Sequence, residues 1–216
     1  MDWQRATTDK QKESRRNDIF ETTLSLFKEH GYENVSFNKI AKEAGFTKSN
    51  MYRYFKSKED IFLAIFGEMF KTWQTHYISE LRKLNVNESY TVFARTWVDS
   101  YLKYPNFLDL IPLLFISLEK NSSYEQLIKF KAMSKELLFQ VALDVGRVYP
   151  SLDPDKAFKL INSSFATTSN FWAANFQNET LIKIYEQEEF KFLQPNFEED
   201  LTFSIKIFLR GLLSSD

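Results

Sequence analysis

The sequence predicts an all-α protein, and three observations support this prediction. The chain has five Gly and five Pro in 216 residues, and the first Pro is at position 105, so few residues are available to turn a many-stranded sheet. Apolar residues recur at steps of three and four through most of the chain, which is the period of a helix. Aromatic residues make up 17% of the composition, enough ring area for a large buried core.

The composition excludes several classes of site. The chain has no Cys, so disulfides, thiolate zinc sites and Cys nucleophiles are excluded, and its two His are too few for a His-rich metal site. We therefore expect no metal and no cofactor. Residues 1–18 are polar and charged and lack the apolar run of a signal peptide, so we expect no secretion. The uncharged stretch 160–178 contains ten Ser, Thr, Asn or Gln, so we read it as a buried or interface helix and expect a cytoplasmic protein without a membrane partner.

Charge is distributed unevenly along the chain. Through Lys58 there are twelve Lys or Arg against eight Asp or Glu, a net charge of +4, and the remainder carries sixteen against twenty-one, a net charge of −5. A basic N-terminal quarter on a mildly acidic body is compatible with a nucleic-acid reader joined to a second module. Two solvated faces of opposite sign would give the same numbers, so charge alone does not decide between these readings.

The first two helices are predicted from their ends. Apolar residues at helical spacing over 12–30 are followed by Gly31, which can end a helix. Ser36 can cap a short helix over 37–44, and Gly45 supplies the positive φ that would end it.

A third short helix and a long fourth helix are expected next. Thr47 can cap a helix over 48–54 after only about three turn residues. Residues 57–60, Ser-Lys-Glu-Asp, form a capping-box pattern that would open a long helix running through Leu81.

The rest of the chain is predicted to continue as helices with weaker boundary signals. Caps and Pro residues place them at about 89–104, 105–115, 123–145, 154–176 and 198–213. We therefore expect a flexible N-terminal leader, a three-helix helix-turn-helix DNA-binding domain and a larger C-terminal helical domain for effector binding and dimerisation, with the boundaries 1–11, 12–60 and 61–216.

The segment 35–58 contains the motif from which we predict the function. Two short helices joined by a tight Gly-containing turn form a helix-turn-helix, whose second helix can enter the major groove. Turning Met51 and Phe55 inward leaves a polar outer face that is suited to DNA, with the residues Lys48, Ser49, Asn50, Tyr52 and Arg53. Ser36 and Thr47 place helix N-termini where a phosphate could lie.

The same segment resembles the DNA-binding domain of the TetR/AcrR-type transcriptional regulators over about residues 12–66. The resemblance is carried by Gly31-Tyr32, Val35-Ser36, Ile40-Ala41, Ala44-Gly45-Phe46-Thr47-Lys48, Met51-Tyr52, Tyr54-Phe55 and Ser57-Lys58-Glu59. It implies that Lys48, Ser49, Asn50 and Tyr52 contact bases or backbone and that Tyr54 and Lys58 reach phosphates. Many family members have Gly and a small residue where this chain has Ser49-Asn50, so the operator sequence does not carry over from a relative.

The C-terminal body is expected to form a homodimer. A single recognition helix reads few bases, so helix-turn-helix proteins commonly bind as symmetric dimers. The family resemblance implicates the last two long helices, 155–176 and 198–213, as a four-helix seam. The apolar residues at helical spacing along these helices are Phe158, Ile161, Phe165, Trp172, Phe176, Leu201, Ile205, Phe208 and Leu212. Each of them could instead belong to a core stripe within one chain.

The middle helices are expected to hold an effector among aromatic rings with a few polar tips. The candidates are Trp73, His76, Tyr77, Trp97, Tyr101, Phe115, Phe139, Asn170 and Trp172. This chemistry suits a small hydrophobic or aromatic molecule, including a cationic one.

The sequence thus predicts a ligand-responsive transcriptional regulator that binds a palindromic operator, and we expect it to be a repressor. The alternative is a helical dimeric protein-interaction module that has lost DNA binding. An enzyme is not expected, because the chain has no nucleophile, phosphate-loop or metalloprotease motif.

Overall fold

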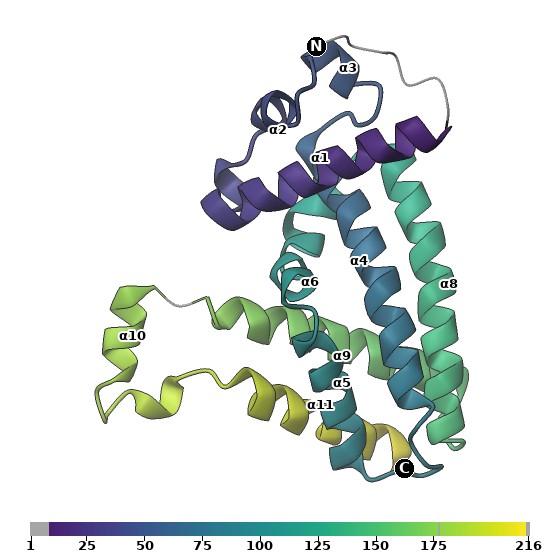
Figure 1. The fold of residues 1–216 in the computed structure, drawn as a ribbon. Helices are drawn as coiled ribbons and strands as arrows, with labels where there is room; N and C mark the ends of the chain where they lie inside the picture. Colours follow the sequence, from purple (N-terminus) through teal and green to yellow (C-terminus); the bar gives the residue numbers. More distant parts are fainter. Residues whose placement is uncertain (1–8, 177, 215–216) are drawn as a thin grey trace. The chain divides into compact units, whose positions relative to one another are not determined.

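The protein is helical throughout the part of the chain that its computed structural model describes, residues 9–176 and 178–214 (Figure 1). No strand occurs in these residues. Residues 1–8 of the expected leader lie outside them, and residues 9–11 already belong to the first helix. None of the helices in the described ranges combines the length and the apolar character that a bilayer span requires.

The elements follow one another with short connections. In chain order they are α1 (Asp9–His30), η1 (Tyr32–Asn34), α2 (Phe37–Glu43), α3 (Lys48–Met51), α4 (Lys58–Leu81), α5 (Tyr90–Leu102), α6 (Pro105–Leu110), the π-helical segment η2 (Leu114–Leu118), α7 (Glu119–Asn121), α8 (Tyr124–Val148), α9 (Pro154–Ala174), α10 (Glu179–Tyr185), η3 (Lys191–Leu193) and α11 (Phe197–Leu213).

The helices divide into two compact units. Among the described residues, the first unit contains 9–67 together with 114–131, and the second contains 68–113 together with 132–214. Two helices, α4 and α8, begin in the first unit and end in the second. The first unit is therefore built from two separate stretches of the chain.

The core of the first unit joins the N-terminal helices to the start of α4. Ile19 from α1, Ile40 from α2, Met51 from α3 and Phe62 from α4 are each fully buried. Val35 and Phe46, which directly precede the capping residues of α2 and α3, are buried as well, as a hydrophobic staple requires.

The core of the second unit is aromatic. Rings from α4, α5 and α6 stack or meet edge to face, with centroid separations of 4.5 Å for Trp73 and Tyr101, 5.6 Å for Trp73 and Trp97, and 6.2 Å for Phe70 and Phe107. Such ring pairs stabilise a core beyond the area that they bury.

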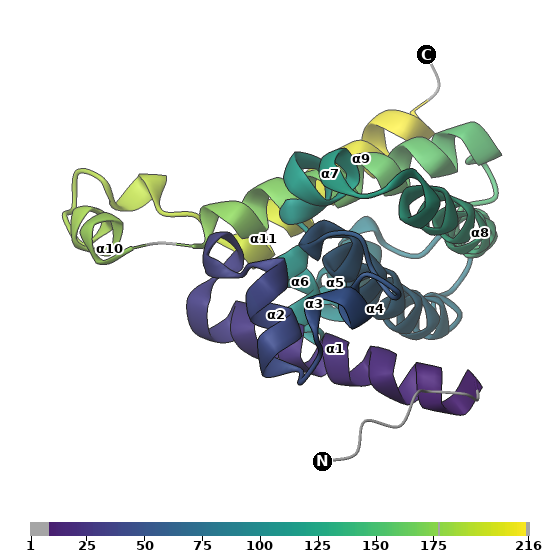
Figure 2. The same ribbon diagram turned by 90° about the horizontal axis from the view of Figure 1, so that it is seen from above.

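In the second unit, α9 and α11 pack side by side and run in opposite directions (Figures 1 and 2). The start of α11 lies at the end of α9, where the Phe197 and Trp172 rings meet edge to face at 5.0 Å. The segment between the two helices, with α10 and η3, stands off from their ends in both views.

Most predicted helices differ from the structure by a few residues at one or both ends, and three of them show the kinds of difference. The third ends at Met51 and continues as hydrogen-bonded turns through Tyr54 and Phe55, so it is shorter than the predicted 48–54. The predicted helix 105–115 stops at Leu110, just before Pro112, which lacks the N–H that a continuing helix needs. The chain then forms η2, which the sequence did not predict. The predicted helix 198–213 begins one residue earlier, at Phe197.

Candidate functional site

The two short helices of the first unit are capped as the sequence predicts. The Ser36 Oγ accepts a hydrogen bond from the backbone N of Lys39 at 3.2 Å, and the Thr47 Oγ1 accepts one from the backbone N of Asn50 at 3.3 Å. Between the helices Gly45 adopts φ 72°, a conformation that favours Gly. These local interactions set the helix-turn-helix geometry, and α3 is its second helix.

The expected inner and outer faces of α3 are present. Met51 is fully buried and Phe55 is 5% exposed, so both belong to the core. Among the predicted DNA contacts, Ser36, Thr47, Lys48, Ser49, Tyr52 and Arg53 are exposed, whereas Asn50, Tyr54 and Lys58 are half-buried. The outer face therefore offers a cation, hydroxyls and a guanidinium to solvent around one helix end.

Aromatic contacts hold the two tyrosines of this surface. Tyr52 is 50% exposed, yet its ring packs on Phe37 with a centroid separation of 5.0 Å, and the Lys48 Nζ lies 5.9 Å from the Tyr52 centroid. The Tyr54 ring meets Phe46 edge to face at 5.7 Å. Packing thus restricts both phenol rings before any ligand is bound, which reduces the entropy lost on binding.

Lys58 has an intramolecular partner that the sequence did not reveal. Its Nζ donates to the backbone O of Tyr32 at 3.1 Å and lies 4.1 Å from the centroid of the Tyr32 ring. An ammonium has three donors, so two remain available for a phosphate. A phosphate contact by Lys58 remains a prediction.

The stretch 114–131 is hydrogen-bonded to the N-terminal part of the first unit. The hydroxyls of Tyr32 and Ser117 lie 2.7 Å apart, and the Tyr32 hydroxyl also donates to the Glu59 Oε1 at 3.2 Å. Burial is the largest cause that raises the pKa of Tyr32 above its usual value, so the phenol stays protonated and able to donate.

A second connection runs through the buried carboxylate of Asp60. It accepts from the backbone N and the Oγ of Ser123 and from the backbone N of Lys56, and the Lys56 Nζ pairs with Glu125 at 2.8 Å. The hydrogen bond from Lys56 lowers the pKa of Glu125. The pattern of residues 57–60 predicts only a local capping box that includes Asp60. Only its acidic character next to the helix-turn-helix could have suggested a wider role.

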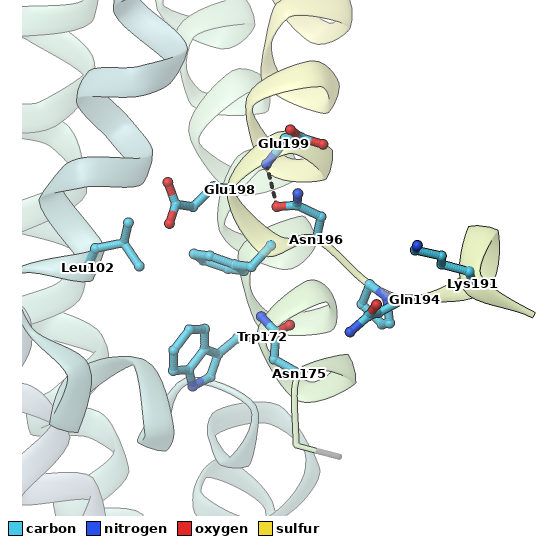
Figure 3. A pocket seen from close by; sticks show the side chains of 10 residues that line it. Leu102, Trp172, Asn175, Lys191, Gln194, Asn196, Glu198 and Glu199 are labelled. Atoms are coloured by element: carbon cyan, nitrogen blue, oxygen red, sulfur yellow. Dashed lines mark hydrogen bonds between the residues drawn. The ribbon is translucent and has the colours of Figure 1, made fainter. Parts of the chain in front are cut away.

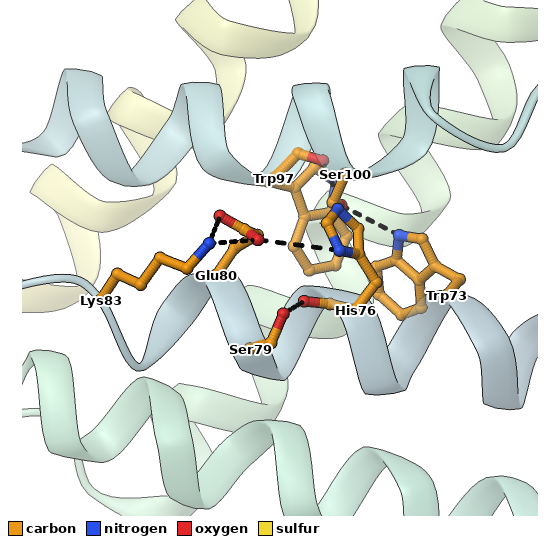
Figure 4. Close-up of polar contacts among 7 residues, drawn as sticks. All are labelled: Trp73, His76, Ser79, Glu80, Lys83, Trp97 and Ser100. Carbon is orange, nitrogen blue, oxygen red and sulfur yellow. Dashed lines mark hydrogen bonds and ion pairs between the residues drawn. The ribbon is translucent and has the colours of Figure 1, made fainter.

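Four predicted effector contacts form the centre of the second unit. Trp73, Tyr77, Trp97 and Tyr101 are all at most 1% exposed. Ser100 connects the two tryptophans, because the Trp73 Nε1 donates to the Ser100 Oγ at 2.9 Å and the Ser100 Oγ donates to the Trp97 backbone O at 2.6 Å (Figure 4).

Two hydroxyls in this cluster have no hydrogen-bond partner. The Oη atoms of Tyr77 and Tyr101 are both buried without one, and the Ser164 Oγ on α9 shares this property. Burial raises the pKa of both tyrosines far above the usual value, so both hydroxyls are donors. Leaving such a donor unpaired costs about 1–3 kcal/mol, which makes the cluster receptive to an acceptor atom.

The other predicted effector residues lie elsewhere. His76 is half-buried next to Glu80, with 3.7 Å between the Nδ1 and the Oε1, and burial is the largest cause that lowers its pKa (Figure 4). Phe139 and Asn170 are exposed, and Phe115 is exposed on the first unit. His76 lies at the edge of the buried aromatic cluster, where its ring meets Tyr104 at 5.7 Å, whereas no hydrogen bond or ring contact joins Phe139 or Asn170 to that cluster in the described residues.

A cavity of about 590 Å³ lies in the second unit where α9 ends and α11 begins (Figure 3). Of the predicted effector residues only Trp172 lines it, and the Trp172 indole is oriented by a hydrogen bond of 3.0 Å to the Asp109 Oδ1. The other lining residues are Leu102, Asn175, Lys191, Gln194, Pro195, Asn196, Phe197, Glu198 and Glu199. These residues have mixed chemistry and follow no regular spacing, so the sequence did not predict that they line a cavity.

The predicted dimer residues fall into two groups. Phe158 and Phe176 are exposed, and Phe165, Trp172, Phe208 and Leu212 are half-buried. Ile161, Leu201 and Ile205 are at most 2% exposed within their own chain. A side chain without exposed surface cannot contact a second copy, so the seam prediction is corrected for these three residues, which pack in the core between α9 and α11.

Comparison with known families matches nearly the whole chain. Residues 19–65 match the family described as bacterial regulatory proteins, tetR family, and residues 68–216 match the tetracyclin repressor-like C-terminal domain. The fatty acid metabolism regulator protein of Bacillus subtilis is 22% identical over 178 residues, covering 81% of this chain and 92% of the relative. An HTH-type transcriptional regulator of Staphylococcus aureus is 38% identical over 86 residues, covering 37% of this chain and 46% of the relative.

Solved structures share the fold. Thermus thermophilus FadR, a TetR family transcriptional repressor in complex with lauroyl-CoA, aligns with a TM-score of 0.61 at 16% identity, covering 93% of this chain and 96% of that one. Bacillus subtilis FadR in complex with stearoyl-CoA aligns with a TM-score of 0.53 at 18% identity, covering 92% and 97%. With both family domains matched and a helix-turn-helix at the N-terminal end, the chain belongs to the TetR family and is a ligand-responsive transcriptional regulator.

Proposed function

We propose that the chain is a repressor that binds a palindromic DNA operator as a homodimer and leaves it when a hydrophobic effector binds. The observation that carries the proposal is the outer face of α3, where Lys48, Ser49 and Arg53 are exposed around a helix whose opposite side is anchored by buried Met51. Arg and Asn side chains can make paired hydrogen bonds to guanine and adenine, and Lys can contact phosphate.

The two recognition helices of the dimer would enter successive major grooves. Two half-sites one helical turn apart require the α3 helices to lie about 34–36 Å from each other. The N-termini of α2 and α3, capped by Ser36 and Thr47, would face phosphates, and Tyr52, Tyr54 and Lys58 would fix the register on the backbone.

The effector is proposed to bind at the aromatic cluster of the second unit. Trp73, Trp97, Tyr77 and Tyr101 are fully buried, so an effector would have to separate these rings, and it would then meet apolar surface next to the two unpaired tyrosine hydroxyls. Acyl-CoA thioesters combine a long apolar chain with a carbonyl acceptor, and the FadR proteins that share the fold are named in complex with lauroyl-CoA and stearoyl-CoA. We therefore propose acyl-CoA thioesters as the effector class.

The response is proposed to pass along the two helices that both units share. Residues 58–67 of α4 lie in the first unit and residues 68–81 in the second, and α8 is continuous in the same way. An effector that binds one conformation more tightly shifts the population towards it, and moving the ratio from 1:99 to 99:1 requires about 5.5 kcal/mol of differential binding.

Selection of bound duplexes from a random DNA pool tests the proposal. We expect a palindromic consensus, and addition of a long-chain acyl-CoA to the selected complex should release the DNA, whereas free coenzyme A should not. If no sequence is enriched, the DNA-binding proposal is wrong. If a palindrome is enriched but acyl-CoAs bind without releasing it, only the proposed response is wrong.

The alternative of an interaction module that has lost DNA binding is less favoured, because residues 19–65 match the tetR family of bacterial regulatory proteins and the Staphylococcus aureus relative is named an HTH-type transcriptional regulator. Binding to random duplex at low salt separates the two functions, since a module without DNA binding would lack this non-specific affinity. We propose no catalytic activity and a cytoplasmic location, where a regulator meets bacterial DNA.

A further inference from the structure

The segment between α9 and α11 exposes large apolar side chains. We call residues 178–194, which include α10 and η3, the arm. Within it Leu181, Ile182, Phe192 and Leu193 are 37%, 46%, 81% and 53% exposed. Figures 1 and 2 both show the arm standing away from the ends of α9 and α11. Grouped apolar exposure of this kind is typical of a surface that another molecule covers.

The neighbouring helix pair carries a second exposed apolar set. Phe158 on α9 is 48% exposed, and Phe203 and Ile207 on α11 are 64% and 45% exposed. TetR-family regulators act as dimers, and α9 and α11 are the helices on which the proposed homodimer rests. The arm is continuous with this face because it directly joins the two helices.

Charge distinguishes the two ends of the helix pair. The arm has four Glu and two Lys, a net charge of 2 − 4 = −2, and the adjoining start of α11 adds Glu198, Glu199 and Asp200. The far end, residues 153–160 of the α9 region and 206–213 of α11, has three Lys and one Arg against two Asp, a net charge of 4 − 2 = +2. Because α9 and α11 run in opposite directions, each end combines residues from both helices.

We infer that in the homodimer each arm lies across the basic far end of the partner copy's α9–α11 pair. A two-fold axis that sets the helix pairs antiparallel brings the acidic end of one copy onto the basic end of the other, and does so twice. The reverse alignment would bring two acidic ends together, which is unfavourable. The inference rests on the proposed homodimer and adds to it a partner surface and an orientation.

The geometry is consistent with the helix lengths. α9 has 21 residues, so at about 1.5 Å per residue it is about 31 Å long. When two such helices overlap fully in antiparallel orientation, the end of one, where the arm begins, lies next to the start of the other. The arm would therefore start next to the partner's basic end, and folding back across that end would let its apolar side chains cover the aliphatic stems of the lysines there.

Cross-linking tests the orientation directly, because the chain has no Cys of its own. Differently tagged Glu189→Cys and Lys159→Cys proteins are mixed, allowed to exchange subunits and oxidised. Both positions are exposed. A disulfide forms only where the Cα atoms come within about 7 Å, so a short bismaleimide is used in parallel. We expect a cross-linked dimer that carries both tags.

The matched control pairs Glu189→Cys with Glu199→Cys at the acidic end. Cross-linking of this pair, but not of the pair with Lys159→Cys, would overturn the inferred orientation. A dimer in sedimentation that gives neither product would overturn the arm contact altogether. A wild-type chain that sediments as a monomer at micromolar concentration would instead overturn the homodimer in the proposed function, so the two failures are distinguishable.

A second measurement does not depend on cross-linking chemistry. Phe192→Ser together with Leu193→Ser should raise the dimer dissociation constant at least tenfold, while Ile128→Ser, which removes a 51% exposed side chain from the first unit, should leave it unchanged. The reversal Lys159→Glu should weaken the dimer, and adding Glu189→Lys should restore it. Unchanged dimerisation in the arm variant, or no rescue by the charge swap, contradicts the inference.

Discussion

The Asp60 carboxylate accepts hydrogen bonds from both the backbone N and the Oγ of Ser123, at 2.7 Å and 2.9 Å, although the two residues are 63 positions apart. Asp60 is in the first turn of α4, and Ser123 directly precedes α8. One buried side chain thus ties the starts of the two helices that both units share.

Replacing Asp60 tests how much this connection stabilises the protein. Asp60→Ala leaves the backbone N atoms of Ser123 and Lys56 without their acceptor, so we expect the free energy of unfolding to fall by about 3 kcal/mol. Ser123→Ala removes only the hydroxyl and should cost about 1 kcal/mol. Urea unfolding followed by circular dichroism measures both. Equal losses in the two variants would mean that the backbone hydrogen bonds contribute little.

Lys48 should contact a phosphate or base at the start of α3. Loss of one phosphate contact reduces the slope of log affinity against log salt by about one unit, and Lys48→Ala should show this reduction. Lys71→Ala, which removes an exposed lysine paired with Glu68 in the second unit, is the control and should leave the slope unchanged. Fluorescence anisotropy over a salt series gives the slopes, and identical slopes for wild type and Lys48→Ala would rule the contact out.

His76 should make the free energy of unfolding depend on pH. Burial is the largest cause that lowers its pKa below 6.5 in the folded protein, so between the lowered pKa and about 6.5 the unfolded chain binds more protons. Stability from this residue is therefore complete above about pH 6.5 and is lost as the pH falls below it. His76→Gln should flatten the dependence of unfolding free energy on pH in this window. If the unfolding free energy of the variant depends on pH as steeply as that of the wild type, another residue causes the pH dependence.

Tyr101→Phe separates stability from effector binding. The hydroxyl is buried without a partner, so removing it should leave the unfolding free energy unchanged or raise it by up to about 1 kcal/mol. If an acyl-CoA carbonyl accepts from that hydroxyl, the same variant should bind the effector about tenfold more weakly. Calorimetry with a long-chain acyl-CoA provides the affinity. Unaltered affinity, whatever the stability of the variant, would remove Tyr101 from the proposed effector site.

The helix-turn-helix could be predicted because its determinants are local. Ser36 and Thr47 each accept a hydrogen bond from the backbone N three residues ahead, and Gly45 sets the turn by its own φ. Each signal lies within a few residues of the structure that it determines, so reading the chain in order is sufficient. The exposure of Lys48 and Arg53 follows from the helical period once Met51 is placed inward.

Features that depend on distant parts of the chain could not be predicted. Ser117 in the π-helical segment forms a hydrogen bond with the Tyr32 hydroxyl, and no local sequence pattern predicts a partner 85 residues away. Helical spacing also does not reveal what an apolar face contacts. Ile161 and Phe158 both fit the expected stripe on α9, but the first is buried in its own chain and the second is exposed.

The claim that α3 reads DNA sequence is tested most directly by one ratio, the affinity for the selected operator divided by the affinity for random duplex at the same salt. For the wild type we predict a ratio of about 10³ or more. Asn50→Ala combined with Arg53→Ala, with its helix content and melting temperature retained, should lower this ratio at least tenfold, because base contacts carry the specificity. A folded double variant with the wild-type ratio would contradict the account.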